Sequence, residues 1–177
     1  DDAHRGGTVR YLDGSRAIEV LAPVADRARR LRPGTVLASP AWWRRVEALL
    51  TAPTSGKLPP HVLVHRDEEG EADGYAVYSS QERWVDGMAR GEVEVRDLVS
   101  CTPESHAELW RVLCSLDLVV EVTTDQIPLD DPLPWMLVDQ RAIRTTNLAD
   151  GLWLKLLDVP AVFAPAALPA FTSAGES

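Results

Sequence analysis

Cysteine is scarce in this sequence, where Cys101 and Cys114 are the two among 177 residues. Two cysteines form no disulfide framework and supply too few ligands for a zinc site, so a reducing cytoplasm is the expected compartment. Long apolar runs are also lacking, because no stretch approaches the roughly 20 residues that a membrane span requires. The sequence shows no signal peptide and opens at Asp1 without a methionine, which predicts a fragment of a longer protein.

Positive charge is in short supply, since 18 Lys and Arg stand against 27 Asp and Glu and give a net charge of −9. Nucleic-acid-binding domains usually carry a basic face, so nucleic acid is not an expected partner. The acids concentrate in residues 92–131, which hold ten of them against two arginines. Such a segment is either an acidic wall that faces amines or a solvated face, and the solvated face is the commoner outcome.

Motifs for nucleophilic catalysis and for phosphate binding are missing as well. No G-x-S-x-G elbow occurs, neither cysteine lies in a recognisable catalytic signature, and the P-loop and Rossmann glycine patterns are absent. His61 and His65 have the four-residue spacing of metal ligands on a helix. They fall in a predicted strand, where this spacing only places them on one face. We therefore predict no catalytic residue and no metal site in this chain.

The apolar periodicity predicts one domain of helices and strands. The clearest helix is 102–117, with Thr102 as N-cap and Pro103 in the first turn. Residues 17–21 are ambiguous between strand and helix, and Pro23 is expected to begin a helix that ends near Arg32. The other predicted elements are strands at 6–13, 61–66, 75–80, 91–100, 118–124, 142–146 and 151–158, a helix at 41–50, and a short helix opened by Val159-Pro160.

This order of elements predicts an α/β fold of the α+β type. The three strands between residues 61 and 100 follow one another directly, which favours an antiparallel meander. The whole predicts a mostly antiparallel mixed sheet flanked by helices over residues 1–168, with a linker or disordered tail at 169–177. The outline is similar to the GNAT fold of acetyltransferases.

GNAT enzymes bind acetyl-CoA through a glycine-containing R/Q-x-x-G-x-G/A loop at a helix N-terminus, where backbone amides meet the pyrophosphate. Residues 30–34, RLRPG, come nearest to this loop in composition. Their glycine falls one place late, and the segment ends a predicted helix where the loop should begin one. We therefore expect that acetyl-CoA is the co-substrate of a parent enzyme and is not bound by this chain alone.

The sequence resembles the central domain of the Eis (enhanced intracellular survival) acetyltransferases. The resemblance is carried by GGTVRYLD, SPAWW, DGYAVY, the ELWRVLCSLD helix, and above all by the order DDPLPWMLVD, RAIRTT and DGLWLKLLDVPAV within residues 130–162. It implies a neighbouring N-terminal GNAT domain with the acetyl-CoA site and the catalytic tyrosine. It also implies a C-terminal sterol-carrier-like domain whose terminal carboxylate is the general base. The resemblance further implies a homo-oligomer, which is a hexamer in this family. It also implies secretion as an alternative to a cytoplasmic location.

The resemblance also implies two substrate-binding positions. A tryptophan of the Pro-started helix would line the substrate cavity, and Trp43 matches it best, with Trp42 as the alternative. Asp150, before the Gly-Leu-Trp segment, would face a cationic amine. Without the resemblance, the tryptophans would be packing residues at a domain contact and Asp150 a turn residue.

Three functions stay open at this point. The first is a part of an N-acetyltransferase for aminoglycoside-like or other polyamine substrates, in which this domain supplies pocket walls and subunit contacts. The second is a stand-alone, non-catalytic GNAT-like module with a structural or interaction role. The third is a different α/β enzyme whose site is not recognisable in the sequence. The first makes the parent protein an enzyme and leaves open whether the fragment alone has activity.

Overall fold

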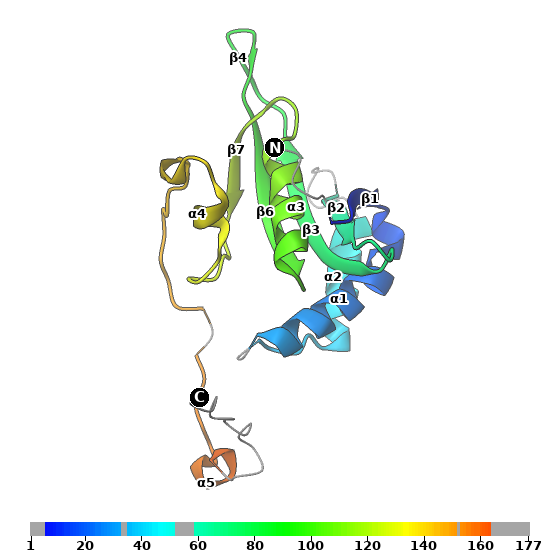
Figure 1. Ribbon diagram of the computed structural model, residues 1–177, viewed down its shortest axis with the longest axis vertical. Coiled ribbons are helices and arrows are strands. Elements are labelled where there is room, and N and C mark those ends of the chain that lie inside the picture. Colours follow the sequence, from blue (N-terminus) through cyan, green and yellow to red (C-terminus); the bar gives the residue numbers. More distant parts are fainter. Residues whose placement is uncertain (1–5, 33–34, 52–58, 152, 164–177) are drawn as a thin grey trace, which may run out of the picture. The chain divides into compact units, whose positions relative to one another are not determined.

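The computed structural model describes residues 6–32, 35–51, 59–151 and 153–163. The chain divides into two compact units, Asp1–Gln140 and Arg141–Ser177. Figure 1 traces the order of the elements along the chain. The tail predicted at 169–177 lies outside the described residues.

The first unit contains a mixed sheet, three long helices and a small hairpin. Its elements are β1 (Thr8–Leu12), a 3-10 turn (Gly14–Arg16), α1 (Ala17–Leu31), α2 (Pro40–Thr51), β2 (His61–Arg66), β3 (Ala72–Gln81), β4 (Trp84–Val85), β5 (Met88–Ala89), β6 (Gly91–Ser100), α3 (Pro103–Cys114), β7 (Val119–Thr124) and α4 (Leu133–Met136). A second 3-10 turn (Gln140–Ala142) and α5 (Val159–Val162) follow.

The sheet has the strand order β1-β2-β3-β6-β7 within the described residues. Neighbouring strands from β1 to β6 are antiparallel, and β6 pairs with β7 in parallel through the crossover helix α3. A parallel pair requires such a crossover, whereas the β2–β3 pair is joined by the short polar segment 67–71. The predicted meander, the mixed sheet and the α/β fold class are confirmed.

Helices cover both faces of this sheet. Buried side chains of α1 and α2 form one apolar cluster with alternate residues of β2 and β3; its members are Ala17, Leu21, Val24, Leu50, Val62, Val64, Tyr75 and Val77. Because strand side chains alternate, Leu63 and His65 point to the opposite face. There α3 lies along β3 and β6, as Figure 1 shows in green, and its Leu109 and Leu113 are fully buried.

The prediction that Pro23 begins a helix is wrong. α1 begins at Ala17, and Pro23 lies within it. A proline inside a helix removes one hydrogen bond and crowds the preceding turn. The apolar face of α1 offsets this cost, because Ala17, Leu21 and Val24 recur at helical spacing and are all buried against the sheet.

The strands predicted at 142–146 and 151–158 are also absent from the described part of these segments, which has no strand. A strand needs a partner for its backbone N–H and C=O groups, and none of the described residues of the second unit provides one. The short helix opened by Val159-Pro160 is confirmed as α5, with Asp158 as its N-cap. Conversely, the β4–β5 hairpin was not predicted, although its Asp86-Gly87 turn has positive φ at both residues and is a common hairpin signal.

Candidate functional site

The N-terminus of α3 is the place where this fold would bind an anionic cofactor. It follows β6 and leads to the parallel strand β7, and ligands of such units bind beyond the carboxyl ends of the parallel strands. A helix start offers unpaired backbone N–H groups and a partial positive charge to phosphate. The side chains around Thr102 therefore decide whether a pyrophosphate can be held here.

Side chains of the helix itself occupy this start. The backbone N–H of Ser105 donates to Thr102 Oγ1 at 3.1 Å, and the N–H of Thr102 donates to Ser105 Oγ at 3.3 Å, which together form a capping box. Pro103 has no N–H to donate. Glu104 adds a negative charge in the first turn, where it interacts favourably with the helix and would repel phosphate. No glycine lies in this turn to let a ligand approach the backbone.

A buried carboxylate lies beside the same helix start. Thr102 Oγ1 donates to Asp73 Oδ2 at 2.9 Å, and Asp73 Oδ1 is 2.5 Å from His65 Nδ1. The other ring nitrogen, His65 Nε2, is 2.9 Å from the carbonyl oxygen of Gly6. Asp73 and His65 are both buried. The network thus ties β2 and β3 to the start of α3.

A β-bulge explains how Asp73 comes to lie there. In the β2–β3 register His65 pairs with Gly74 and Arg66 pairs with Ala72, so Asp73 is the extra residue of β3. A bulge re-aims the side chain of the extra residue. The sequence did not reveal this network, because His65, Asp73 and Thr102 come from three separate elements and no local motif connects them.

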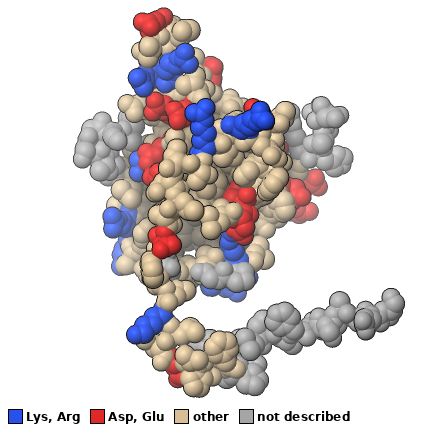
Figure 2. Space-filling model, turned by 90° about the vertical axis from the view of Figure 1, so that its left-hand side faces the viewer, with Lys and Arg blue, Asp and Glu red and all other residues tan. Residues whose placement is uncertain are grey.

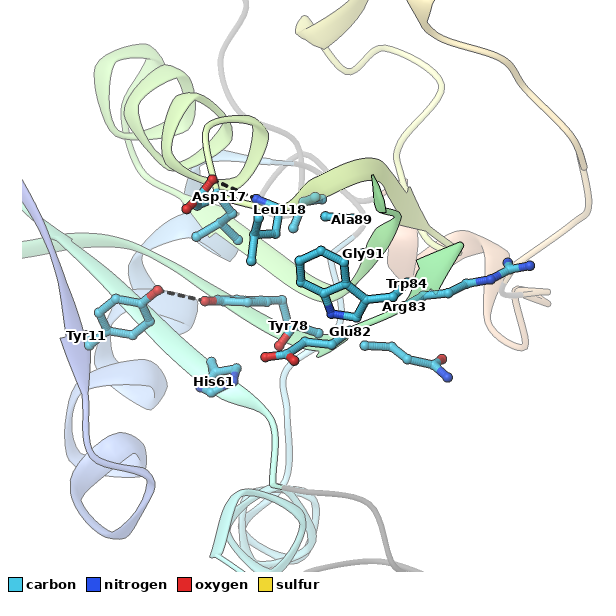
Figure 3. Close-up of a pocket in the computed structure, with 14 residues that line it drawn as sticks. Tyr11, His61, Tyr78, Glu82, Arg83, Trp84, Ala89, Gly91, Asp117 and Leu118 are labelled. Carbon is cyan, nitrogen blue, oxygen red and sulfur yellow. Dashed lines mark hydrogen bonds between the residues drawn. The ribbon is translucent and has the colours of Figure 1, made fainter. Parts of the chain in front are cut away.

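An open pocket of about 270 Å³ lies elsewhere on the first unit. Residues of β1, β2, β3, β4 and the α3–β7 connection line it, among them Tyr11, His61, Tyr78 and Trp84. Figure 3 shows these side chains around a common space. The pocket contains none of the predicted site residues, and the sequence analysis missed it because its aromatic residues are spread over four strands.

Comparisons with known proteins agree with this fold. A family model described as an acetyltransferase (GNAT) domain matches residues 34–156. The crystal structure of Eis1 from Mycobacterium abscessus superposes with a TM-score of 0.73 at 33% identity, over 89% of this chain and 38% of that one. N-acetyltransferase Eis of Mycobacterium tuberculosis is 32% identical over 156 residues, which are 88% of this chain and 36% of that protein. This chain belongs to the Eis family of GNAT acetyltransferases.

Other relatives of this Eis-family chain come from Streptomyces. An uncharacterized N-acetyltransferase of Streptomyces avermitilis is 33% identical over 155 residues, covering 87% of this chain and 37% of that protein. The chain thus spans little more than a third of the length of the curated relatives it matches. A ribosomal-protein-alanine N-acetyltransferase of Brucella melitensis, at 14% identity and a TM-score of 0.51, shares the fold.

The predicted substrate-binding residues of the Eis-family chain lie in both units. Trp43 is half-buried and packs against the α1–α2 cluster, whereas Trp42 is 54% exposed. The two neighbours therefore point in different directions, as helix geometry requires. Asp150 is exposed in a segment without regular structure in the second unit. The roles of Trp43, Trp42 and Asp150 remain predictions.

The acid-rich segment 92–131 of the Eis-family chain is extensively paired. Glu92 and Glu94 lie 3.3 Å from Arg83 and Arg96, respectively. Glu108 contacts Arg111 at 2.6 Å. On the face seen in Figure 2, acidic and basic side chains are interspersed and do not gather into a patch of one sign. These pairs favour a solvated face over an acidic wall.

Among the described residues, no group of three or more His, Cys, Asp or Glu side chains could hold a metal ion. In the same part of the Eis-family chain, no helix is both long enough and apolar enough to span a membrane.

Proposed function

We propose that this chain is the central GNAT-like domain of an Eis-type N-acetyltransferase and that acetyl-CoA binds to another part of that protein. The self-capped start of α3 carries the proposal. Thr102, Pro103 and Glu104 leave few free amides and a negative charge where a pyrophosphate would bind. The chain matches little more than a third of the length of its relatives. The remaining length of such a protein would include the domain that holds the cofactor.

The proposed substrates are cationic amines such as aminoglycosides and other polyamines. In the reaction a neutral amine nitrogen attacks the thioester carbonyl of acetyl-CoA, the bond to sulfur breaks, and the amine proton passes to a general base. Positioning of the two reactants and removal of this proton supply most of the rate. This domain would supply walls of the amine pocket and subunit contacts, with Trp43 or Trp42 offering an aromatic face and Asp150 a carboxylate to ammonium groups.

The test uses the product of the complete gene. That protein, incubated with acetyl-CoA and either an aminoglycoside or spermidine, should yield N-acetylated products detectable by mass spectrometry. A complete gene product with flanking domains but no acetyl transfer to any amine would contradict the proposal.

A non-catalytic GNAT-like module is the second candidate, and the same closed helix start favours it. The two functions differ in what the gene encodes on either side of this segment. An acetyl-CoA loop upstream and a sterol-carrier-like domain downstream would support the enzyme, and their absence from the complete gene would support the module.

A further inference from the structure

The open pocket of the first unit has an aromatic floor built from three neighbouring strands. Tyr11 of β1 and Tyr78 of β3 join their hydroxyl groups in a hydrogen bond of 2.9 Å. The ring of His61, on β2 between them, lies 5.1 Å from the Tyr78 ring centroid and 6.3 Å from that of Tyr11. The floor is therefore continuous, and Tyr78 forms its buried end.

Two walls rise from this floor. One is the start of the β4–β5 hairpin, where the indole of Trp84 is 60% exposed and lies over the pocket (Figure 3). The other is the α3–β7 connection, in which Leu118 has a φ of 64°. This backbone conformation is rarely adopted by a branched residue, and such positions concentrate at functional sites. The N–H of Gly91 fixes the connection by donating to the Leu118 carbonyl at 2.9 Å.

The charges at the rim of the pocket are negative. Glu82 and Asp117 line it, and no ion pair joins either of them to a cation among the described residues; Asp117 Oδ1 accepts the Leu118 N–H at 2.9 Å. Arg83 is the cation in the lining, but it contacts Glu92 at 3.3 Å. In Figure 3 its guanidinium group points away from the aromatic rings. An anion would therefore meet uncompensated carboxylates here.

The phenol of Tyr78 adds no charge that would offset these carboxylates. Burial, and then the hydrogen bond with Tyr11, raise the pKa of Tyr78 above its ordinary value, so this hydroxyl stays neutral. Electron-rich faces of tyrosine and tryptophan beside carboxylates that have no ion-pair partner form the arrangement that recognises ammonium groups. A volume of about 270 Å³ admits a small ligand or the head group of a larger one.

We propose that this pocket binds a small organic cation, a quaternary or alkylated ammonium group, in the space lined by Trp84, the Tyr11–His61–Tyr78 floor and Glu82. The lining of this pocket comes from the first unit and contains none of the predicted residues Trp42, Trp43 and Asp150. It does not depend on acetyl transfer, so its failure would leave the proposed function untouched.

The experiment compares two probes of the same shape. Choline chloride and its neutral carbon analogue, 3,3-dimethylbutan-1-ol, are titrated separately into the 177-residue chain at constant ionic strength, followed by calorimetry and tryptophan fluorescence. The proposal predicts saturable choline binding at least about threefold tighter than binding of the neutral analogue. Equal affinities would indicate an apolar pocket without cation recognition, and no saturation with either probe would likewise overturn the proposal.

Matched variants then locate the site. Trp84→Leu should weaken choline binding about threefold to tenfold, and Glu82→Gln about twofold to threefold. Trp135→Leu and Glu68→Gln remove an exposed indole and an exposed carboxylate outside the pocket and should leave the affinity unchanged. Thermal unfolding of each variant confirms its fold. Equal weakening by the pocket and control variants, or none by Trp84→Leu and Glu82→Gln in folded protein, contradicts the assignment.

Discussion

At the scale of single residues, Thr102 has two structural roles at the position where a GNAT enzyme would carry its cofactor loop. Its hydroxyl caps α3 and also donates to the buried carboxylate of Asp73. The sequence predicted the cap, because an N-cap threonine before proline is a local signal. It could not predict Asp73, which lies 29 residues away and reaches Thr102 through a β-bulge. Trp43, Trp42 and Asp150 stay predictions, since the family resemblance alone implies their roles.

Replacement of Thr102 by valine keeps the shape of the side chain and removes its oxygen. The Ser105 amide and Asp73 Oδ2 each lose a partner, so Thr102→Val should lower the free energy of unfolding by about 2 kcal/mol. Urea denaturation measures this change. Thr51→Val is the control, because the Thr51 hydroxyl donates to Glu47 at the exposed end of α2, and its effect should stay below about 0.5 kcal/mol. Equal effects of the two substitutions would show that the contacts of Thr102 with Asp73 and Ser105 do not stabilise the fold.

Asp131 should make stability depend on pH. Burial alone would raise the pKa of its carboxyl group, but the contact with His106, the Leu133 N–H and the charges of His106 and Arg32 outweigh burial and hold it below 3.8. The folded state therefore binds its proton less readily than the unfolded state. The resulting stabilisation is complete above pH 3.8 and is lost as the pH falls below that value.

Asp131→Asn should therefore cost about 1 kcal/mol at pH 7, and its difference from the wild type should shrink as the pH falls below the ordinary aspartate value. Urea unfolding between about pH 3 and 7 provides the measurement. Asp125→Asn, at an exposed position, should change stability by less than about 0.5 kcal/mol at pH 7. If the difference in unfolding free energy between Asp131→Asn and the wild type grows on acidification, folding does not lower the pKa of Asp131 and the prediction is wrong.

Asp150→Ala tests the predicted substrate contact in the complete enzyme. Loss of the carboxylate should raise KM for a multiply charged amine several-fold and change kcat little, because ground-state and transition-state contacts with a remote ammonium group are lost together. Steady-state kinetics with an aminoglycoside and with a monoamine separate the effect of charge. An unchanged KM for the multiply charged substrate would remove Asp150 from the amine site.

At the scale of elements, turn and cap residues predicted a helix or strand correctly where the local sequence favoured one structure only. The meander strands and α3 carried their own turns and caps, and each lies close to its predicted range. α1 was misplaced because Pro23 resembles a helix start, while burial of Ala17 and Leu21 on the sheet extends the helix through it. The segments 142–146 and 151–158 were predicted as strands, but pairing depends on a partner strand that their own sequence does not specify.

The close contact between β3 and α3 gives a prediction at this scale. A Cβ added at Gly74 would lie 3.0 Å from Ser105 Cβ and 3.1 Å from Leu109 Cδ1, so Gly74→Ala should push the helix from the sheet and cost about 1 to 2 kcal/mol. Gly151→Ala is the control, because its Cβ would meet no described atom within 4 Å. Urea denaturation compares the two. If Gly74→Ala is as stable as Gly151→Ala, α3 does not pack on β3 as described.

At the scale of the whole molecule, the central proposal is that this GNAT domain does not hold the acetyl-CoA pyrophosphate at the start of α3. The family was recognisable from the sequence, because the order of its segments survives at about a third identity. The absent glycine loop predicts that this chain does not bind acetyl-CoA, and the capping box, Pro103 and Glu104 support that prediction, which stays untested.

Calorimetric titration of the 177-residue chain with acetyl-CoA tests this claim most directly. A GNAT domain that carries the glycine loop serves as the positive control under the same conditions. We expect no saturable heat of binding for this chain at acetyl-CoA concentrations up to about 1 mM, because the start of α3 presents a carboxylate and few free amides to a pyrophosphate. Saturable binding with a micromolar dissociation constant would contradict it.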